Sequence, residues 1–146
     1  MFSKTCDYAL RASVFVARNS PSGRKLSIPE IAREIESPEH FTGKILQTLV
    51  KSGIIQSSKG PGGGFFVDQQ ATPTPVMRVL EAFGCEKFFY RCALGLKQCS
   101  DRFPCPMHEE FKPYREGLKN LVERTTIQML AAEIRQGHTR LTNIMG

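Results

Sequence analysis

Apolar residues recur every three or four positions through most of the chain, which is the spacing of one buried face of an α-helix. The first run predicts a helix from about Ser3 to Asn19, and shorter runs predict helices over residues 28–35 and 38–52. Ser27-Ile28-Pro29-Glu30 has the form of a capping box, and Ser37-Pro38 has the form of an N-cap before a first-turn proline. Because the connection between these two short helices is so brief, they must cross steeply, as in a helix-turn-helix.

A glycine-rich segment follows the third predicted helix and separates two strand-like runs, residues 54–58 and 65–67. The segment is Lys59-Gly60-Pro61-Gly62-Gly63-Gly64, so the two runs are expected to form a hairpin directly after a recognition helix, which is the position of a wing. Glycines let backbone N–H groups approach a duplex closely, and Lys59 supplies a charge for a phosphate. A nucleotide-binding phosphate loop is the alternative, but its Gly-Lys-Ser/Thr ending and its following helix are missing.

The second half of the chain returns to helical spacing twice. Pro75 to Phe83 is predicted to be a short helix that Gly84 ends, whereas residues 85–105 show no period and are expected to form a loop. Beyond Pro106, apolar positions alternate gaps of four and three, at Met107, Phe111, Tyr114, Leu118 and Leu121. This narrow stripe is typical of a coiled-coil seam. Thr125-Thr126 is expected to cap a last helix, with Ile127, Leu130 and Ile134 turned inward.

The seam also indicates how the chain is organised. A seam on a helix that projects from a small domain favours a homodimer, because operators are usually read as paired half-sites, although it could pack on its own domain. We therefore expect a mainly α-helical fold with a small β-hairpin wing, in three parts. These parts are a winged helix-turn-helix DNA-binding domain (1–84), a cysteine-rich loop (85–106), and a long dimerisation helix with a short C-terminal helix (107–146).

Charge and targeting signals narrow the function. The formal net charge is +6, and residues 1–67 carry nine Lys or Arg against five Asp or Glu. This excess favours a polyanionic partner, although a solvated basic surface would give it too. A secretory signal needs an uninterrupted apolar segment, whereas charged residues interrupt the N-terminal stretch of this chain. No apolar run reaches the ~18 residues that a membrane span needs. The chain is thus expected in the cytoplasm, with its five cysteines reduced and available for metal or redox chemistry.

Four potential soft ligands gather in the predicted loop and at its end: Cys92, Cys99, Cys105 and His108. Packing in a hydrophobic core does not explain why these residues occur together, because the predicted loop has no regular buried face. Their gaps are too wide for a zinc knuckle, whereas thiolates with a histidine in place of one of them suit an iron–sulfur cluster. Zinc and metal-free thiols are the alternatives. Cys6 is expected in the core, and Cys85 is expected to be a buried small side chain, with a role as a redox partner left open.

Several motifs together resemble the Rrf2 family of bacterial winged-helix regulators. They are Asp7-Tyr8-Ala9-Leu10-Arg11-Ala12, the segment Ile45 to Gly53, the wing Lys59 to Phe65, and the three late cysteines, so that the resemblance covers nearly the whole chain. It implies a dimer in which the long C-terminal helices cross and each cysteine loop lies near the first helix of the other subunit. It also implies that Cys92, Cys99 and Cys105 hold a [2Fe–2S] or [4Fe–4S] cluster.

For the fourth ligand the resemblance implies two alternatives. In IscR-like members it is a histidine three residues after the last cysteine, where this chain has His108. In NsrR-like members it is an acid early in the first helix of the partner subunit, where this chain has Asp7. A surface histidine and a carboxylate that faces a helix dipole are the simpler interpretations. The gap between Cys92 and Cys99 is longer than is usual in these relatives, which could alter the cluster type.

The predicted recognition helix and wing supply the candidate DNA-binding residues, which are His40, Thr42, Gly43, Lys44, Lys59, Gly60, Gly62 and Gly63. The exposed side of the helix is expected to enter the major groove, and the wing is expected to meet the minor groove or its phosphates. Each of these residues could instead be an ordinary solvated residue.

The sequence as a whole predicts a DNA-binding transcriptional regulator, most simply a dimeric repressor of a palindromic operator. It would sense redox state, nitric oxide or iron–sulfur status through a cluster, and a metal-free repressor controlled by thiols or by a partner is the alternative. An enzyme is not expected, because the chain lacks a Ser/His/Asp set, a nucleotide fingerprint and a Cys-X-X-Cys pair.

Overall fold

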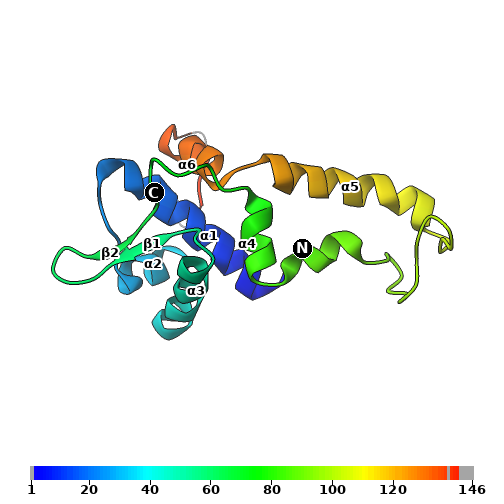
Figure 1. Cartoon of the computed structure of the whole chain (residues 1–146), viewed down its shortest axis with the longest axis horizontal. Helices are drawn as coiled ribbons and strands as arrows, with labels where there is room; N and C mark the ends of the chain where they lie inside the picture. The colour runs from blue at the N-terminus through cyan, green and yellow to red at the C-terminus, as the bar shows by residue number, and fades with distance from the viewer. Residues whose placement is uncertain (1, 138, 142–146) are drawn as a thin grey trace.

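Helix α1 (Lys4–Asn19) lies at the centre of the helical body in the computed structural model, which describes residues 2–137 and 139–141 (Figure 1). It begins where the Ser3 hydroxyl accepts a hydrogen bond from the Cys6 N–H at 3.3 Å. A short 3-10 helix, η1 (Ser20–Ser22), follows, and Gly23 then turns the chain with a φ of 76°. Among the described residues, no helix is both long and apolar enough to cross a membrane.

The helix-turn-helix consists of α2 (Ile28–Glu34) and α3 (Glu39–Lys51). The predicted capping box is present, since Ser27 and Glu30 each accept a hydrogen bond from the other's backbone N–H. Between the two helices, Glu36 adopts a left-handed φ of 55° and turns the chain. The prediction of Ser37 as the N-cap of α3 is wrong: Pro38 takes that position because it keeps an extended ψ of 140°, and no side chain caps the helix.

The wing is an antiparallel hairpin of β1 (Gln56–Ser58) and β2 (Gly64–Phe66), in which Ser57 lies opposite Phe65. Leu26 forms one antiparallel bridge with Phe65 and exchanges backbone hydrogen bonds with it at 2.8 and 2.9 Å. This bridge ties the hairpin to the segment that enters α2. The hairpin projects from one end of the helical body (Figure 1). The predicted winged helix-turn-helix fold is confirmed.

Replacing Gly64 by alanine should lower the free energy of unfolding by about 1–3 kcal/mol, as measured by urea denaturation. Its φ of 143° disfavours a side chain, and a Cβ atom would lie 2.6 Å from the Leu26 carbonyl oxygen. Gly117 is the matched control, because it has no positive φ and open space where its Cβ would be. If G64A lowered the free energy of unfolding no more than G117A does, the close approach of Gly64 to Leu26 would not contribute to the stability of the wing.

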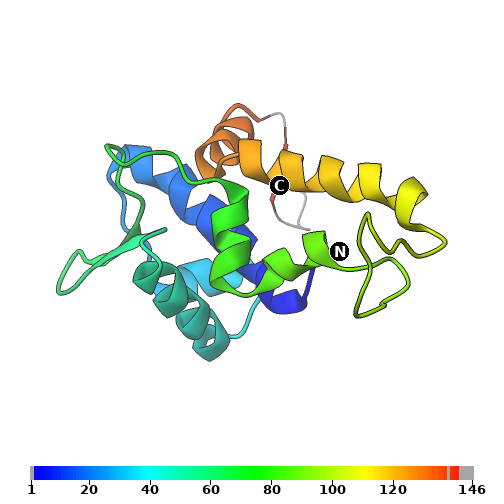
Figure 2. The ribbon, with the colours of Figure 1, turned by 45° about the vertical axis from the view of Figure 1, so that its right-hand side comes forward.

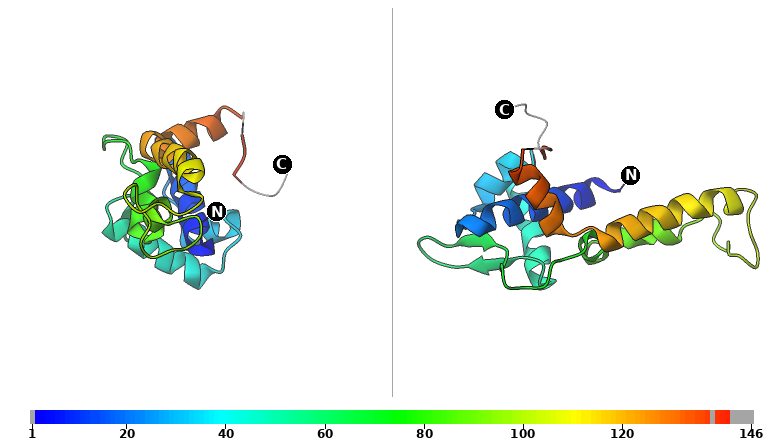
Figure 3. Two further views of the ribbon diagram at one scale, coloured as in Figure 1. Left: turned by 90° about the vertical axis from the view of Figure 1, so that its right-hand side faces the viewer. Right: turned by 90° about the horizontal axis from the view of Figure 1, so that it is seen from above.

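Helix α4 (Val76–Ala82) leads through Gly84, at a φ of 70°, into a 3-10 helix, η2 (Cys85–Tyr90). The expectation of a loop is therefore wrong for residues 85–90, because a segment this short shows no helical period and its rings pack against Phe2 from the start of the chain. Helix α5 (His108–Arg124) then extends away from the body. Figures 1 and 3 show η2 beside it and residues 91–107 at its far end.

Helix α6 (Ile127–Arg135) returns to the body and packs against α1 (Figure 2). Thr126 caps it as predicted, accepting a hydrogen bond from the Met129 N–H at 3.1 Å. Ile127 and Ile134 are buried, but the inward position predicted for Leu130 is wrong, because Ala131 lies there instead. Helix α6 thus shares the core of α1. The division of the chain into three parts stays a prediction, and residues 138 and 142–146 of its last part lie outside the described residues.

Two of the cysteines are paired, which corrects the expectation that all five are reduced. Cys6 is buried in the core as predicted, but it forms a disulfide with Cys85, whose Cα atom is 6.7 Å away. Cys85 is only half-buried. The pairing was not foreseen because 79 positions separate the two residues along the chain.

Candidate metal centre and nucleic-acid interface

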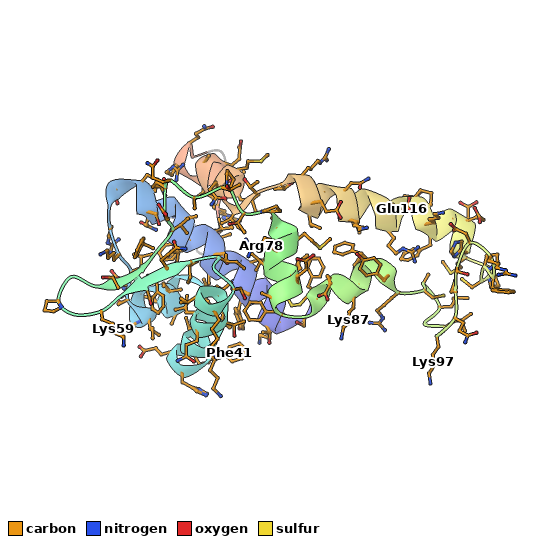
Figure 4. The ribbon with its side chains drawn as sticks, viewed as in Figure 1. Phe41, Lys59, Arg78, Lys87, Lys97 and Glu116 are labelled. Atoms are coloured by element: carbon orange, nitrogen blue, oxygen red, sulfur yellow. A yellow bond between two sulfur atoms is a disulfide. The ribbon has the colours of Figure 1, made fainter. Side chains whose placement is uncertain are left out.

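Three thiols converge in the loop at the far end of α5, which Lys97 marks in Figure 4. The Sγ atoms of Cys92, Cys99 and Cys105 lie within 4.8 Å of one another, and those of Cys92 and Cys105 are 3.4 Å apart. Cys105 is buried and the other two are half-buried. The structure therefore brings together the three predicted cysteine ligands, although they are separated in sequence and no helix or strand holds them.

His108 is the first residue of α5 and is buried between a thiol and a carboxylate. Its Nδ1 atom lies 3.2 Å from Cys99 Sγ, and its Nε2 atom lies 2.8 Å from an oxygen of Asp101. Because an ionised carboxylate only accepts hydrogen bonds, the Nε2 atom carries a proton, and Nδ1 is the nitrogen that faces the thiols. This burial rules out the simpler interpretation of His108 as a surface residue.

Asp101 is itself held by Lys112, whose ammonium group donates to both carboxylate oxygens at 2.8 and 2.9 Å. The hydrogen bonds from Lys112 and then from His108 lower the pKa of Asp101 to about 2, so this carboxylate is ionised at any ordinary pH. Sequence reasoning missed both residues. The one available signal was that Lys112 lies four positions after His108, on the same face of a predicted helix.

The thiols of the loop differ in how readily they ionise. Desolvation opposes a charge on Cys92, but hydrogen bonds from the backbone of Leu96 and Leu94 and from the neighbouring thiols outweigh it and lower the pKa of Cys92 to about 7. Cys99 accepts a hydrogen bond from the Cys105 backbone, yet desolvation and the sulfurs of Cys105 and Cys92 outweigh that bond and raise its pKa. One thiolate at neutral pH is thus favoured at Cys92.

Alkylation of the metal-free protein should therefore modify Cys92 before Cys99 at pH 7. A thiol reacts as its thiolate, and Cys92, with a pKa of about 7, is half ionised there while Cys99 is almost fully protonated. The rate at Cys92 should rise up to about pH 8 and then level off, because its ionisation is then nearly complete. Iodoacetamide labelling followed by peptide mass spectrometry measures both rates, and faster labelling of Cys99 would contradict the assignment.

Asp7, the alternative fourth ligand, is exposed in the first turn of α1. It lines a shallow pocket with Leu10, Arg11 and Leu141. None of the contacts among the described residues joins it to the three loop cysteines, so it could act only across a dimer, as the sequence resemblance implies.

The candidate DNA-binding residues lie on α3 and the wing, and Figure 4 shows Phe41 and Lys59 on these two elements. His40, Lys44 and Lys59 are exposed. Gly43 is half-buried where α3 passes α2, and a Cβ atom there would lie 3.6 Å from the Ile28 side chain. The two lysines and the histidine are therefore free to meet a duplex, whereas Gly43 already has a packing role.

Thr42 does not lie on the exposed side of α3 as predicted. It is completely buried, and its hydroxyl donates a hydrogen bond to the Pro38 carbonyl oxygen at 2.9 Å. Position 42 shares a helix face with the buried residues Ile45, Leu46 and Leu49, so its helical position outweighs its polarity. A direct base contact by Thr42 is therefore excluded in this conformation.

The wing glycines are required by the hairpin itself. Gly60 and Gly62 have left-handed φ values of 88° and 74°, and a Cβ atom on Gly63 would overlap the Ser58 carbonyl oxygen. This explains the glycine run without invoking a ligand. Contact between these backbone groups and DNA stays a prediction.

Comparison with known proteins agrees with this architecture. Residues 2–133 match the Rrf2 family, described as iron-dependent transcriptional regulators. An HTH-type transcriptional regulator of Aquifex aeolicus (strain VF5) is 30% identical over 132 residues, which cover 89% of this chain and 90% of that protein. The HTH-type transcriptional regulator IscR of Klebsiella pneumoniae (strain 342) is 26% identical over 82% of this chain and 72% of its own length.

Two solved structures share the fold. CymR, the global cysteine regulator of B. subtilis, superposes with a TM-score of 0.72 at 19% identity and covers 90% of this chain and 96% of its own. IscR of T. potens superposes with a TM-score of 0.70 at 14% identity and covers 96% of this chain and 92% of its own.

A helix-turn-helix followed directly by a hairpin wing places this chain among the winged-helix proteins. The chain belongs to the Rrf2 family of transcriptional regulators. The predictions of a transcriptional regulator, of DNA binding and of a protein that is not an enzyme are thereby confirmed.

Proposed function

We propose that this regulator is a cytoplasmic, dimeric repressor that senses redox state, nitric oxide or iron–sulfur status through a cluster on Cys92, Cys99 and Cys105. The convergence of these three sulfurs within 4.8 Å is the observation that carries the proposal. The exposed residues of α3 and the wing would contact a palindromic operator, with His40 and Lys44 in the major groove and Lys59 at a phosphate.

The residues at the site fit an iron–sulfur cluster. Three thiols without other covalent partners and a buried imidazole give the thiolate and nitrogen donors that such clusters accept. When bound, a cluster would supply one-electron chemistry and reactivity toward oxygen or nitric oxide. His108 is the fourth ligand that the single chain supports, because Asp101 holds its Nε2 proton and turns Nδ1 toward Cys99. Asp7 of a partner subunit is the other candidate.

The proposed dimer is supported by the apolar residues that α5 leaves uncovered. Met107 at the N-cap of α5 and Tyr114 and Leu121 within the helix are spaced by seven positions and exposed, and Tyr114 is 73% exposed. A stripe of this kind on a projecting helix (Figure 3) is what a second copy of the chain would bury.

Replacing both Tyr114 and Leu121 by glutamate should raise the dimer dissociation constant by at least about tenfold, because two apolar anchors would become charged groups in a desolvated contact. Sedimentation velocity across a dilution series measures the change. Asn120→Glu adds a charge on another face of α5 and is the matched control. A dimer that tolerated both substitutions as well as it tolerates N120E would not use this face.

The function is tested by purifying the protein without oxygen. We expect iron and sulfide to copurify with it, and operator affinity to change when the cluster is removed by an oxidant or by nitric oxide. Iron and sulfide analysis alongside gel-shift titrations decides this. Operator binding by a protein that never contains iron would favour the metal-free, thiol- or partner-regulated repressor instead.

A further inference from the structure

The disulfide between Cys6 and Cys85 is a second thiol centre, separate from the cysteine loop. Cys6 is buried in the first turn of α1, and Cys85 is the first residue of η2. Their Cα separation of 6.7 Å is within the range that disulfides need, so no movement of the backbone is required to bring the two sulfurs together.

We propose that Cys6 and Cys85 are a reversible thiol–disulfide pair, which small anionic thiols reduce by entering the pocket beside Cys85. A transcriptional regulator works in the compartment that contains the DNA, where thiols are generally kept reduced. A disulfide formed there is usually transient and redox-sensing rather than a permanent brace.

The two sulfurs differ in access, and this sets the order of events. Cys6 is 1% exposed, whereas Cys85 borders an open pocket of about 470 Å³. Lys87 and Arg91 also line this pocket, and both are exposed. Figure 4 shows Lys87 extending from η2 into solvent. Two cations beside the accessible sulfur favour a thiol that carries carboxylates over a neutral one.

Reduction then proceeds by two exchange steps. A thiolate attacks Cys85 Sγ, forms a mixed disulfide and releases Cys6 as a thiolate. The first turn of α1 stabilises that charge, because Ser3 donates a hydrogen bond to Cys6 Sγ at 3.2 Å and the helix N-terminus is positive. A second small thiolate attacks its counterpart in the mixed disulfide, so the free disulfide leaves and Cys85 becomes a thiolate. Two small thiols are oxidised for each protein disulfide reduced.

The pair links the DNA-binding body to the base of the cysteine loop. The segment η2 ends two residues before Cys92. It also contacts the start of the chain through aromatic rings, because Phe2 packs edge-on against Phe88 and Phe89, with ring centroids 5.6 and 6.0 Å apart. Reduction would leave this aromatic contact to hold η2 against the start of the chain. Amide hydrogen exchange over residues 86–91 should become at least about threefold faster on reduction.

The pair is tested on the full-length protein in buffers of reduced and oxidised glutathione, followed by acid quenching, alkylation and peptide mass spectrometry. We expect Cys6 and Cys85 to become protected from alkylation together as the buffer is made more oxidising. Both should show the same midpoint, and this midpoint should depend on the square of the reduced glutathione concentration, because two thiols are consumed per protein disulfide. Independent protection of the two residues, a bond from either one to a loop cysteine, or no protection at any ratio would overturn the proposal. A pair that is reduced only after the protein is unfolded would overturn it too.

The entry route is tested by comparing glutathione with the neutral thiol 2-mercaptoethanol. The double variant K87Q/R91Q should be reduced by glutathione at least about threefold more slowly at low ionic strength. The slowing should be smaller for 2-mercaptoethanol, because its only charge is that of the attacking thiolate. Lys97→Gln, which removes a charge outside the pocket, is the control. Equal slowing of both thiols, or of neither, would overturn the pocket as the route. Because these measurements need neither iron nor DNA, they are independent of the proposed cluster.

Discussion

Replacing Cys105 by alanine should remove the iron–sulfur absorbance of anaerobically purified protein and lower its iron content to less than about one tenth of the wild-type value. Cys105 is the buried member of the three thiols, and its sulfur lies 3.4 Å from that of Cys92. Pro104 and Pro106 flank it, so a neighbouring residue has little freedom to replace the lost ligand. Inductively coupled plasma analysis and visible absorbance measure the loss.

The matched control for this variant is Cys85→Ala, which also removes one cysteine but leaves the loop intact. We expect C85A to retain its iron, provided that a melting curve shows the variant to be folded. Equal iron loss in the two variants would indicate that fold stability, and not ligation, determines the iron content. Full iron retention in C105A would exclude this residue as a ligand.

The same assay separates the two candidate fourth ligands. If His108 is a ligand, H108A should lose or shift the cluster absorbance while D7A keeps it, and the reverse pattern would favour Asp7 from the partner subunit. D101N is a test of orientation, because an amide can donate as well as accept and no longer fixes the proton on His108 Nε2. We expect D101N to weaken iron retention by about 10–100-fold, the range seen when partners of metal ligands are changed.

The parts of the fold that local signals encode could be predicted from the sequence. Ser3, the Ser27–Glu30 capping box and Thr126 begin the helices where predicted, since a cap is decided by residues within one turn of each other. The glycine run likewise predicted the hairpin, because few other residues tolerate the backbone angles at Gly60 and Gly62. These elements fix the winged helix-turn-helix.

What could not be predicted depends on chain paths in three dimensions. The Cys6–Cys85 pair joins residues 79 positions apart, and η2 packs against the ring of Phe2 from the start of the chain. Asp101 reaches His108 only because the loop folds back over the start of α5. Thr42 is different, because its spacing from Ile45 and Leu49 already places it on the buried face of α3. The prediction that it is exposed gave its polarity more weight than its spacing.

Removing the charges of Lys44 and Lys59 should lower operator affinity by at least about 100-fold at 0.1 M salt in a K44Q/K59Q variant. Each lysine is exposed, Lys44 on α3 and Lys59 at the wing, on the surface that would face the duplex. A dimer that uses both residues in both subunits would lose two phosphate contacts from Lys59 and two positive charges in the major groove from Lys44. Each phosphate contact contributes close to one unit of slope in a plot of log affinity against log salt. The slope should therefore become shallower by at least about two units. Fluorescence anisotropy titrations from 0.05 to 0.3 M salt, on an operator selected from random DNA, would measure both quantities at roughly physiological ionic strength.

Lys97→Gln is the control for this experiment, because it removes one positive charge from the cysteine loop at the opposite end of the molecule from the wing (Figure 4). K97Q should leave the slope unchanged, which separates local phosphate contacts from the effect of net charge. His40→Ala should act differently again: a residue that reads bases alters sequence preference while the salt slope stays constant. If a K44Q/K59Q protein bound its operator with the wild-type salt slope, α3 and the wing would not be the surface that meets DNA. These two lysines carry the positive charge that this surface would contribute to binding.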